Sequence, residues 1–249
     1  MKTSFATLIA VLLALFSFGQ IKQGSVRYLV KSNWVKMMES CDYLSKEQRE
    51  RVSYMWGNES EWKSFEILYI DSTYTKYEES EEKAERETDG YAWRKEEYYL
   101  YRDYAKMQIH DIIKFTDKVY IIEDTLIPQS WKILNDIKEV CGHICMNASY
   151  TDTVKDQKIV AWFALDIPLA AGPDRYSGLP GLILEIDINN GARVYTADKI
   201  DTVLPEKVME FPAKQKGKHI KESDYQEKIA KFVADRKAEK QPYFWGIRY

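Results

Sequence analysis

Short stretches in which apolar and polar residues alternate recur along most of this chain, and they indicate β-strands. Side chains on a strand point alternately to its two faces, so this spacing buries one face and leaves the other polar. The pattern therefore predicts a sheet of short strands, rich in β-branched and aromatic residues, at 25–30, 65–71, 98–110, 119–123, 131–135 and 159–163.

The clearest hairpin is expected around Asn190-Gly191, because Asn-Gly readily adopts the positive φ angles of a two-residue type I′ turn. Leu182–Ile188 would form its first strand and Arg193–Ala197 its second. With that loop length, one face of the hairpin belongs to the core and carries Leu182, Leu184, Ile186, Ile188, Tyr195 and Ala197.

Two helix starts are recognisable. Ser45 with Gln48, and Ser223 with Gln226, both fit the reciprocal capping pattern in which a hydroxyl and a Gln side chain bind backbone N–H groups. The second helix carries an apolar stripe at the spacing that would face the sheet, formed by Tyr225, Ile229, Phe232 and Val233. Pro242 stops this helix.

Length and composition limit the class of protein. The 249 residues can form one large domain, and no repeat or Pro-rich or Gly/Ser-rich linker divides them, so a single domain over 20–249 is expected. Basic and acidic residues number 36 and 39, a formal charge of -3, which argues against a nucleic-acid partner.

The N-terminus resembles a secretory signal. Lys2 precedes an apolar stretch from Leu8 to Phe18, and Ser17 and Gly19 supply small residues for cleavage before Gln20. Residues 1–19 are therefore expected to be a signal peptide, and the mature chain to be exported to the periplasm or the cell envelope. No later apolar run approaches the length of a membrane span.

Short catalytic motifs are missing from the sequence: it contains no G-x-S-x-G, H-E-x-x-H, P-loop or dinucleotide-binding pattern. The chain has three histidines, His110, His143 and His219, so a catalytic base has few candidates. The sequence predicts no catalytic residue, no metal and no cofactor.

The densest cluster of reactive side chains is Cys141, His143 and Cys145, which would share one face of a strand and could offer S, N and S ligands to a soft metal. Cys141 and Cys145 would lie roughly 13 Å apart on a strand, too far for a disulfide. Three states remain open: a disulfide from Cys41 to one of them, three reduced thiols, or a metal site. Gly142 indicates a bulge, which would disrupt the alternation that a metal site needs.

A segment from Ala161 to Glu185 combines a strand end with several Gly and Pro residues, and Pro180-Gly181 fits the centre of a type II turn. A loop with so many conformationally fixed positions is rigid. It serves either to close a sheet or to present side chains to a ligand, the candidates being Asp166, Arg175 and Tyr176.

These residues resemble the GLPGLI family of exported Bacteroidota proteins, whose name is the sequence of Gly178–Ile183. The resemblance is specific over about residues 117–200. Upstream, a Trp, a Lys-Glu-hydrophobic segment and Gly-x-x-Cys-x-x-Ala also match. The matching positions are Trp131, Gly142, Cys145, Ala148, Trp162, Phe163, Asp166, Pro168, Gly172, Pro173, Tyr176, Gly178, Leu179, Pro180, Gly181, Leu182 and Ile183.

The resemblance implies an exported, mostly antiparallel β protein of undetermined activity, with an outer-membrane receptor or another envelope protein as partner. The family usually carries an aromatic residue at the position of His143 and has no fixed Cys at position 141, which weakens the metal interpretation.

Together, the sequence predicts a mainly β (α+β) single domain, a curved antiparallel sheet with a C-terminal helix, acting as a non-catalytic binding or accessory module. One alternative is an envelope hydrolase that uses Asp166 and Glu185, because paired carboxylates leave no short motif. Another is a thiol or copper handling protein that uses Cys141, His143 and Cys145.

Overall fold

The computed structural model describes residues 23–56, 60–84, 97–212, 215–242 and 247–248. The expected signal peptide, 1–19, lies outside the described residues. The strands are β1 (Gln23–Asn33), β2 (Glu61–Asp71), β3 (Tyr74–Glu79), β4 (Tyr98–Asp103), β5 (Gln108–Phe115), β6 (Lys118–Thr125), β7 (Lys132–Val140), β8 (His143–Asp152), β9 (Gln157–Ala164), β10 (Leu182–Ile188), β11 (Arg193–Asp201) and β12 (Lys218–Ile220). The helices are α2 (Trp34–Glu39), α3 (Lys46–Trp56) and α4 (Glu222–Ala238).

All twelve strands belong to one open sheet in the order β12-β6-β5-β4-β3-β2-β1-β11-β10-β9-β8-β7. Every pair is antiparallel except β12 with β6. β1 lies near the middle, where it pairs with β2 on one side and β11 on the other, and so joins the two parts of the sheet. The expected single curved antiparallel sheet with a C-terminal helix is confirmed.

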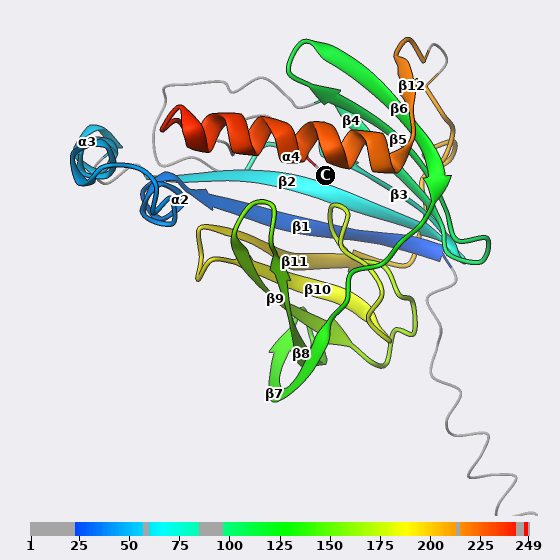
Figure 1. Cartoon of the computed structure of the whole chain (residues 1–249). Coiled ribbons are helices and arrows are strands. Elements are labelled where there is room, and N and C mark those ends of the chain that lie inside the picture. Colours follow the sequence, from blue (N-terminus) through cyan, green and yellow to red (C-terminus); the bar gives the residue numbers. More distant parts are fainter. Residues whose placement is uncertain (1–22, 57–59, 85–96, 213–214, 243–246, 249) are drawn as a thin grey trace, which may run out of the picture.

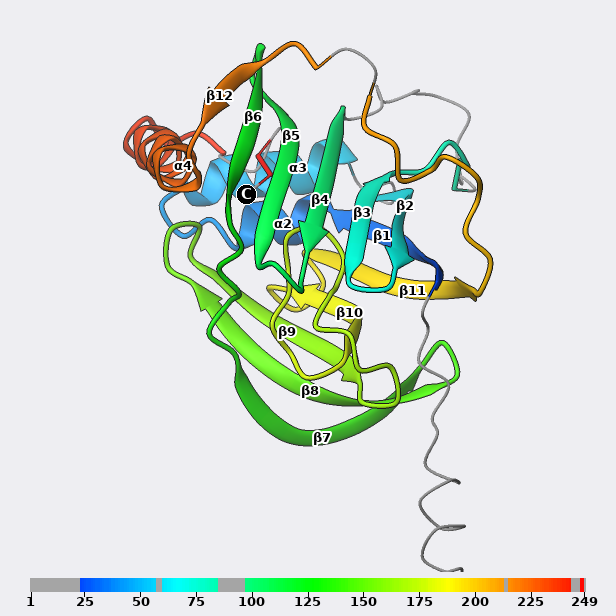
Figure 2. The ribbon, with the colours of Figure 1, turned by 90° about the vertical axis from the view of Figure 1, so that its right-hand side faces the viewer.

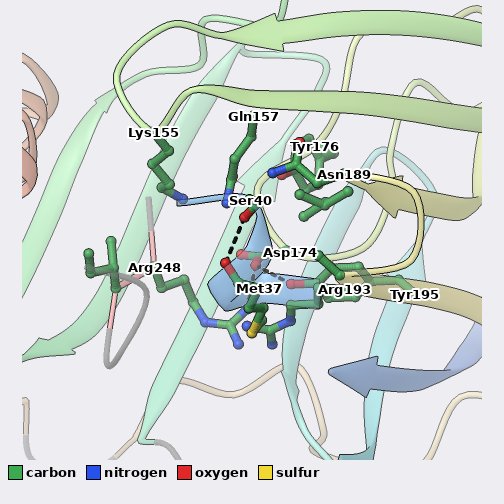
Figure 3. A pocket seen from close by; sticks show the side chains of 13 residues that line it. Met37, Ser40, Lys155, Gln157, Asp174, Tyr176, Asn189, Arg193, Tyr195 and Arg248 are labelled. Atoms are coloured by element: carbon green, nitrogen blue, oxygen red, sulfur yellow. Dashed lines mark hydrogen bonds and ion pairs between the residues drawn. The ribbon is translucent and has the colours of Figure 1, made fainter. Parts of the chain in front are cut away.

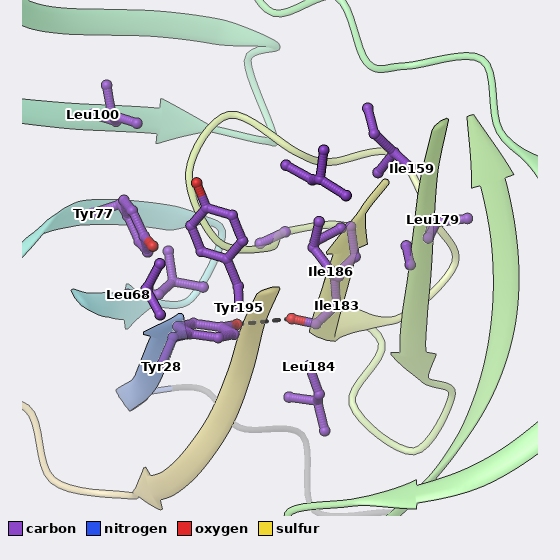
Figure 4. Packing of buried hydrophobic residues seen from close by; sticks show 14 of the residues in the cluster. Tyr28, Leu68, Tyr77, Leu100, Ile159, Leu179, Ile183, Leu184, Ile186 and Tyr195 are labelled. Carbon is purple, nitrogen blue, oxygen red and sulfur yellow. Dashed lines mark hydrogen bonds between the residues drawn. The ribbon is translucent and has the colours of Figure 1, made fainter. Parts of the chain in front are cut away.

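The sheet curves strongly, and its two halves enclose a shared core (Figures 1 and 2). Figure 4 shows this core, in which Tyr28, Leu68 and Tyr77 from one half approach Ile183 and Tyr195 from the other. The Tyr28 hydroxyl donates a hydrogen bond of 2.8 Å to the Ile183 carbonyl. Tyr28 therefore keeps its polar end satisfied inside the core.

α4 lies against the sheet as its stripe predicts, since Tyr225, Ile229 and Val233 are buried and Phe232 packs against the core. Its N-cap is Lys221, two residues before the predicted cap Ser223. The helix begins at Glu222 after Lys221, which makes no side-chain cap, and the carboxylate of Asp124 on β6 accepts the Glu222 N–H at 3.1 Å instead. No helix in the described part of the chain is long and apolar enough to span a membrane.

The predicted cap of α3 is confirmed. The Gln48 N–H donates to the Ser45 hydroxyl at 3.2 Å, and the Ser45 N–H donates to the Gln48 side chain at 2.9 Å.

Two strand predictions need correction. The stretch 98–110 is not one strand, because a turn at 104–107 splits it into β4 and β5, with Met107 at a positive φ of 53°. The loop between β10 and β11 has four residues, since Ile188 pairs with Arg193. Asn189 shares the positive φ with Asn190 and Gly191, so the turn needs three such residues rather than two. The core face of the hairpin is nevertheless buried as expected.

Candidate functional site

The loop between β9 and β10, residues 165–181, lies inside the curve of the sheet (Figure 2). Backbone hydrogen bonds hold it there: Gly178 N–H donates to Ala170 O at 3.0 Å and Ile183 N–H to Ala171 O at 2.9 Å. Among the glycines of the loop, Gly178 has a positive φ of +93°, whereas Gly181 does not. A type II turn requires a positive φ at its third residue, so the expected type II turn centred on Pro180-Gly181 is wrong. Gly181 is needed for close approach, because an added Cβ would lie 2.0 Å from the Ala164 carbonyl oxygen.

Arg175 at the tip of this loop belongs to a buried ion network. Its Nε lies 3.2 Å from Asp111 on β5, and its Nη2 donates to Glu222 at the start of α4 at 2.6 Å. Asp111 has no exposed surface and also accepts two hydrogen bonds from Arg102, one of them at 2.9 Å. Burial alone would lower the pKa of Arg175, but the two carboxylates outweigh burial and raise it. The loop is thus anchored electrostatically to both the sheet and the helix.

Asp174, the neighbour of Arg175, is anchored on the other side of the loop. Its carboxylate accepts a hydrogen bond of 3.0 Å from Tyr195 and lies 2.8 Å from the Arg248 guanidinium. Arg248 and Arg193 both also reach the buried Glu66, at 3.4 and 3.3 Å. Burial acts to raise the pKa of Asp174, and the guanidiniums of Arg248 and Arg193 outweigh it and hold that pKa below its usual range.

A small cavity of about 50 Å³ adjoins Asp174 (Figure 3). Lys155, Arg193 and Arg248 contribute to its walls. Burial lowers the pKa of Lys155 to about 8, and the two guanidiniums add to this effect, whereas Asp152 and Asp174 oppose it. A volume of this size holds a few water molecules at most, so the cavity is too small for a typical organic ligand.

A much larger pocket, about 750 Å³, lies on the Arg175 side of the loop. Most of its walls come from residues 124–130 at and beyond the end of β6, residues 150–154 at and beyond the end of β8, the start of α4, and Arg175 and Tyr176 of the loop. Three cations line it, Arg102, Arg175 and Lys221, and three anions, Asp124, Asp152 and Glu222. This volume is within the range of small-molecule sites.

Arg175 carries a buried hydrogen-bond donor that has no acceptor within the described part of the chain. The residue is 9% exposed, and its Nη1 is buried without a hydrogen-bond partner. At the start of α4, Asp124 accepts the Glu222 N–H, and the next residues, Ser223 and Asp224, are exposed to solvent. Polar side chains such as Gln129, Ser130 and Gln226 line the pocket, so it favours a ligand with hydrogen-bonding groups.

Of the three loop residues proposed from the sequence as ligand contacts, the structure brings two together. Arg175 and Tyr176 both line the large pocket, but Asp166 lies elsewhere, where its carboxylate is 2.7 Å from His143 Nδ1. Glu185 is likewise separate and pairs with Lys138. Neither Asp166 nor Glu185 lines a described pocket, so the paired-carboxylate arrangement of the hydrolase alternative is not found there.

The cysteine cluster also differs from expectation. Cys141 and Gly142 form the two-residue turn between β7 and β8, with φ of 51° and 81°, so Cys141 does not alternate with Cys145 along a strand. Of the three states left open by the sequence, the disulfide from Cys41 is absent, since Cys41, Cys141 and Cys145 are all free thiols. Burial raises the pKa of Cys145 to about 11, which keeps this thiol protonated and unreactive.

The residues that match the family pattern hold the shape of this region. The Trp131 indole N–H donates to the Ser177 carbonyl at 2.8 Å, which ties the start of β7 to the loop. Cys145, Ala148, Phe163 and most of 179–183 are buried in the core. Tyr176, by contrast, contributes to the pocket wall, so it is the motif position with a potential ligand contact.

Sequence reasoning missed Asp111, Asp174, Glu222 and Arg248 as members of the site. One signal was available: Asp111 stands between Ile109 and Ile113, at a position that alternation assigns to the buried face of β5. A charge on a buried strand face requires a partner. Its partners are Arg102 and Arg175, and Arg175 in turn pairs with Glu222, so no local pattern connects such distant segments.

Comparisons with known proteins support the fold and leave the activity open. The sequence model of a family described as "Protein of unknown function (Porph_ging)" matches residues 146–185. This match covers the loop and its flanking strands, and the GLPGLI name is not confirmed by it. No curated protein matches this chain.

Among solved structures, PNGF-II is similar in two crystal forms. In the C2 form the TM-score is 0.54 with 13% identity, and in the P21 form 0.55 with 12% identity. Each match covers 82% of this chain and 32% of that chain, so this chain spans about a third of the length of PNGF-II. At this identity the similarity shows a shared fold alone.

Proposed function

We propose that this chain is a non-catalytic binding module of the cell envelope that holds an uncharged, polar small molecule in the large pocket beside Arg175. The observation that supports this most directly is the pocket of about 750 Å³, whose wall combines the buried, ion-paired Arg175 with the polar side chains of Gln129, Ser130 and Gln226. Side chains of this kind can hydrogen-bond to the oxygens and nitrogens of an uncharged polar ligand.

The balance of charge supports an uncharged ligand. The three cations and three anions of the pocket wall cancel, and Arg175 is already neutralised by Asp111 and Glu222. A charged ligand would face no net opposite field and would lose its hydration on entering. The tyrosines 150 and 176 and the exposed Ile127 offer apolar surface for the carbon skeleton of the ligand.

The arrangement of reactive side chains supports binding without turnover. Neither the small cavity nor the large pocket has a histidine or cysteine among its described lining residues. The carboxylate of Glu222 is engaged by Arg175 and Gln226, and that of Asp124 by backbone N–H groups. These groups are held in place by their partners, which is typical of structural rather than acid–base roles.

Export is part of the same proposal and rests on the apolar segment Leu8–Phe18 followed by small residues. A module of this kind would work in the periplasm or envelope beside a larger partner, such as an outer-membrane receptor. Sequencing the N-terminus of the protein recovered from its native host tests this point, and we expect the mature chain to begin at Gln20.

Ligand binding can be tested with two matched variants. Thr153 is exposed at the pocket wall, so Thr153→Trp should block entry, whereas Thr202→Trp places the same ring at an exposed position outside the described pockets. Wild type and both variants would be screened by thermal shift against uncharged polyols and amides, amino acids, carboxylates and phosphate, at two salt concentrations.

We expect an uncharged polar compound to stabilise wild type and Thr202→Trp, with weak salt dependence, but not Thr153→Trp. The bound compound should be recovered unchanged by mass spectrometry. The proposal fails if only charged compounds bind, if Thr153→Trp binds as well as wild type, or if the compound is converted during incubation.

A further inference from the structure

The strand β7 forms one edge of the open sheet, and in the described part of the chain no strand pairs with its outer side (Figure 2). The opposite edge is β12, which has only three residues, whereas β7 has nine. A long exposed edge strand is a template for pairing with a strand from another molecule, and proteins usually keep such edges short or cover them. β7 is therefore the edge at which this sheet can be extended.

The direction of the backbone groups shows which residues of β7 are open to such pairing. The turn at 141–142 has two residues, so Val140 forms a hydrogen-bonded pair with its partner on β8. In an antiparallel ladder, successive residues direct their N–H and C=O groups to alternate sides of the strand. Those of Val140 and Lys138 consequently face β8, and those of Ile137 and Glu139 face outward.

Three isoleucines form an exposed apolar strip along this edge. Ile133, Ile137 and Ile144 are 52%, 67% and 64% exposed. They share one face of the sheet, because Ile133 lies opposite Ala148 and Ile137 opposite Met146, both on β8 with Ile144 and in alternation with it. Ala148 is fully buried in the core, so the isoleucine strip continues the core face to the edge. Exposed apolar surface of this kind is typical of an interaction site.

The charges of β7 match those of a second copy of β7. Two identical strands related by a two-fold axis pair antiparallel, with one residue opposite itself. If that residue is Ile137, Asp136 of each copy lies opposite Lys138 of the other. Moving the axis by one residue places Asp136 opposite Asp136, or Lys138 opposite Lys138, and like charges directly opposite each other are destabilising. Charge therefore selects the register at Ile137, where the outward backbone groups also meet.

Both charged side chains can accept a further partner. The Lys138 ammonium has three N–H groups and contacts one carboxylate, that of Glu185, and its side chain is 34% exposed. The Asp136 carboxylate accepts a hydrogen bond of 3.0 Å from Asn147 through one of its oxygens, and the residue is exposed. An ion pair across the two copies would thus add to the contacts within each copy.

From these features we infer that β7 is the interface of a homodimer, in which two copies of the chain pair their β7 strands antiparallel about Ile137. The pairing joins the two sheets into one and brings the two isoleucine strips side by side on the same face. The interface lies apart from the large pocket, since no β7 residue lines it.

Charge exchange tests both the dimer and its register by sedimentation equilibrium. Asp136→Lys alone and Lys138→Asp alone each place like charges opposite each other, and each should weaken self-association by more than about tenfold. An equimolar mixture of the two variants should form a heterodimer with about the affinity of the wild-type homodimer, because every charged pair is then complementary. Circular dichroism would check that each variant is folded.

A second pair of variants keeps the test independent of these ion pairs. Ile137→Lys places two ammonium groups at the axis and should abolish dimer formation, whereas Val203→Lys, at a 75% exposed position outside β7, should leave it unchanged. The inference is overturned if wild type stays monomeric up to about 1 mM. It is equally overturned if Ile137→Lys dimerises as wild type does, or if the folded charge-exchange variants do not associate when mixed.

Discussion

Gly181 permits the closest backbone contact of the enclosed loop, and replacing it with alanine should strongly destabilise the protein. The new Cβ would lie 2.0 Å from the Ala164 carbonyl oxygen and 2.7 Å from its carbon, distances that real Cβ atoms do not adopt. The obstacle is main chain on β9, which cannot move aside as a flexible side chain could.

The size of the effect follows from what must separate. To relieve the contact, β10 must move away from β9 by more than about 1 Å, which breaks the pairing of Leu182 with Ala164 and the 2.9 Å bond from Leu182 N–H to Ile167 O. Two backbone hydrogen bonds at about 1 kcal/mol each, together with looser packing around the fully buried Leu182, give a loss of about 3–4 kcal/mol.

Gly142→Ala is the matched comparison. Gly142 has a positive φ of +81° but nothing within 4 Å of an added Cβ, so it suffers only the backbone penalty, about 1 kcal/mol. Urea titrations of wild type and both variants, followed by circular dichroism, would measure the free energies of unfolding. Our reasoning is refuted if the two variants differ by less than about 1 kcal/mol, because the close approach at Gly181 would then be unimportant.

Three other expectations follow from the ion networks and the helix start. Asp111→Asn should cost about 3–5 kcal/mol in a urea titration, because it leaves two buried guanidiniums short of a counter-charge, and a loss below about 1 kcal/mol would contradict this. In the unfolded chain Lys155 keeps its proton up to the ordinary pKa of 10.5, whereas in the folded chain it releases the proton near pH 8. The free energy of unfolding should therefore rise with pH between 8 and 10, and Lys155→Met should flatten that rise in urea titrations at several pH values. Asp124→Ala should lower the free energy of unfolding by about 1 kcal/mol through loss of the α4 cap, whereas Ser223→Ala should change it by less than about 0.5 kcal/mol, and a reversed order would restore Ser223 as the cap.

The strands and the C-terminal helix could be predicted from the sequence because their signals are local. Alternation located most strands within a few residues, and the spacing of Tyr225, Ile229 and Val233 identified the buried face of α4. The errors occurred at turns, where non-glycine residues such as Met107 and Asn189 adopt a positive φ, and where a tertiary contact replaced a local one. The start of α4 is capped by Asp124 from β6, which no pattern near Ser223 reveals.

The candidate site was less predictable for a related reason. The Gly and Pro pattern located the loop, which backbone hydrogen bonds and ion pairs hold in place, and Arg175 and Tyr176 were identified within it. Their chemical setting depends on Asp111 and Glu222, which lie 64 and 47 residues away from Arg175 along the chain. These ion pairs form because the curvature of the sheet brings distant segments together, and the pattern of a single sequence does not predict that curvature.

The position of β1 at the centre of the sheet has a consequence for synthesis. β1 is the first strand of the described chain to be translated, yet its partner Thr196 on β11 follows Leu29 by 167 residues. At about 5–20 residues per second, the ribosome needs on the order of ten seconds or more to deliver β11. During that interval one long side of β1 has no neighbour, so the nascent protein depends on a chaperone or on an extended state to avoid pairing with another copy of itself.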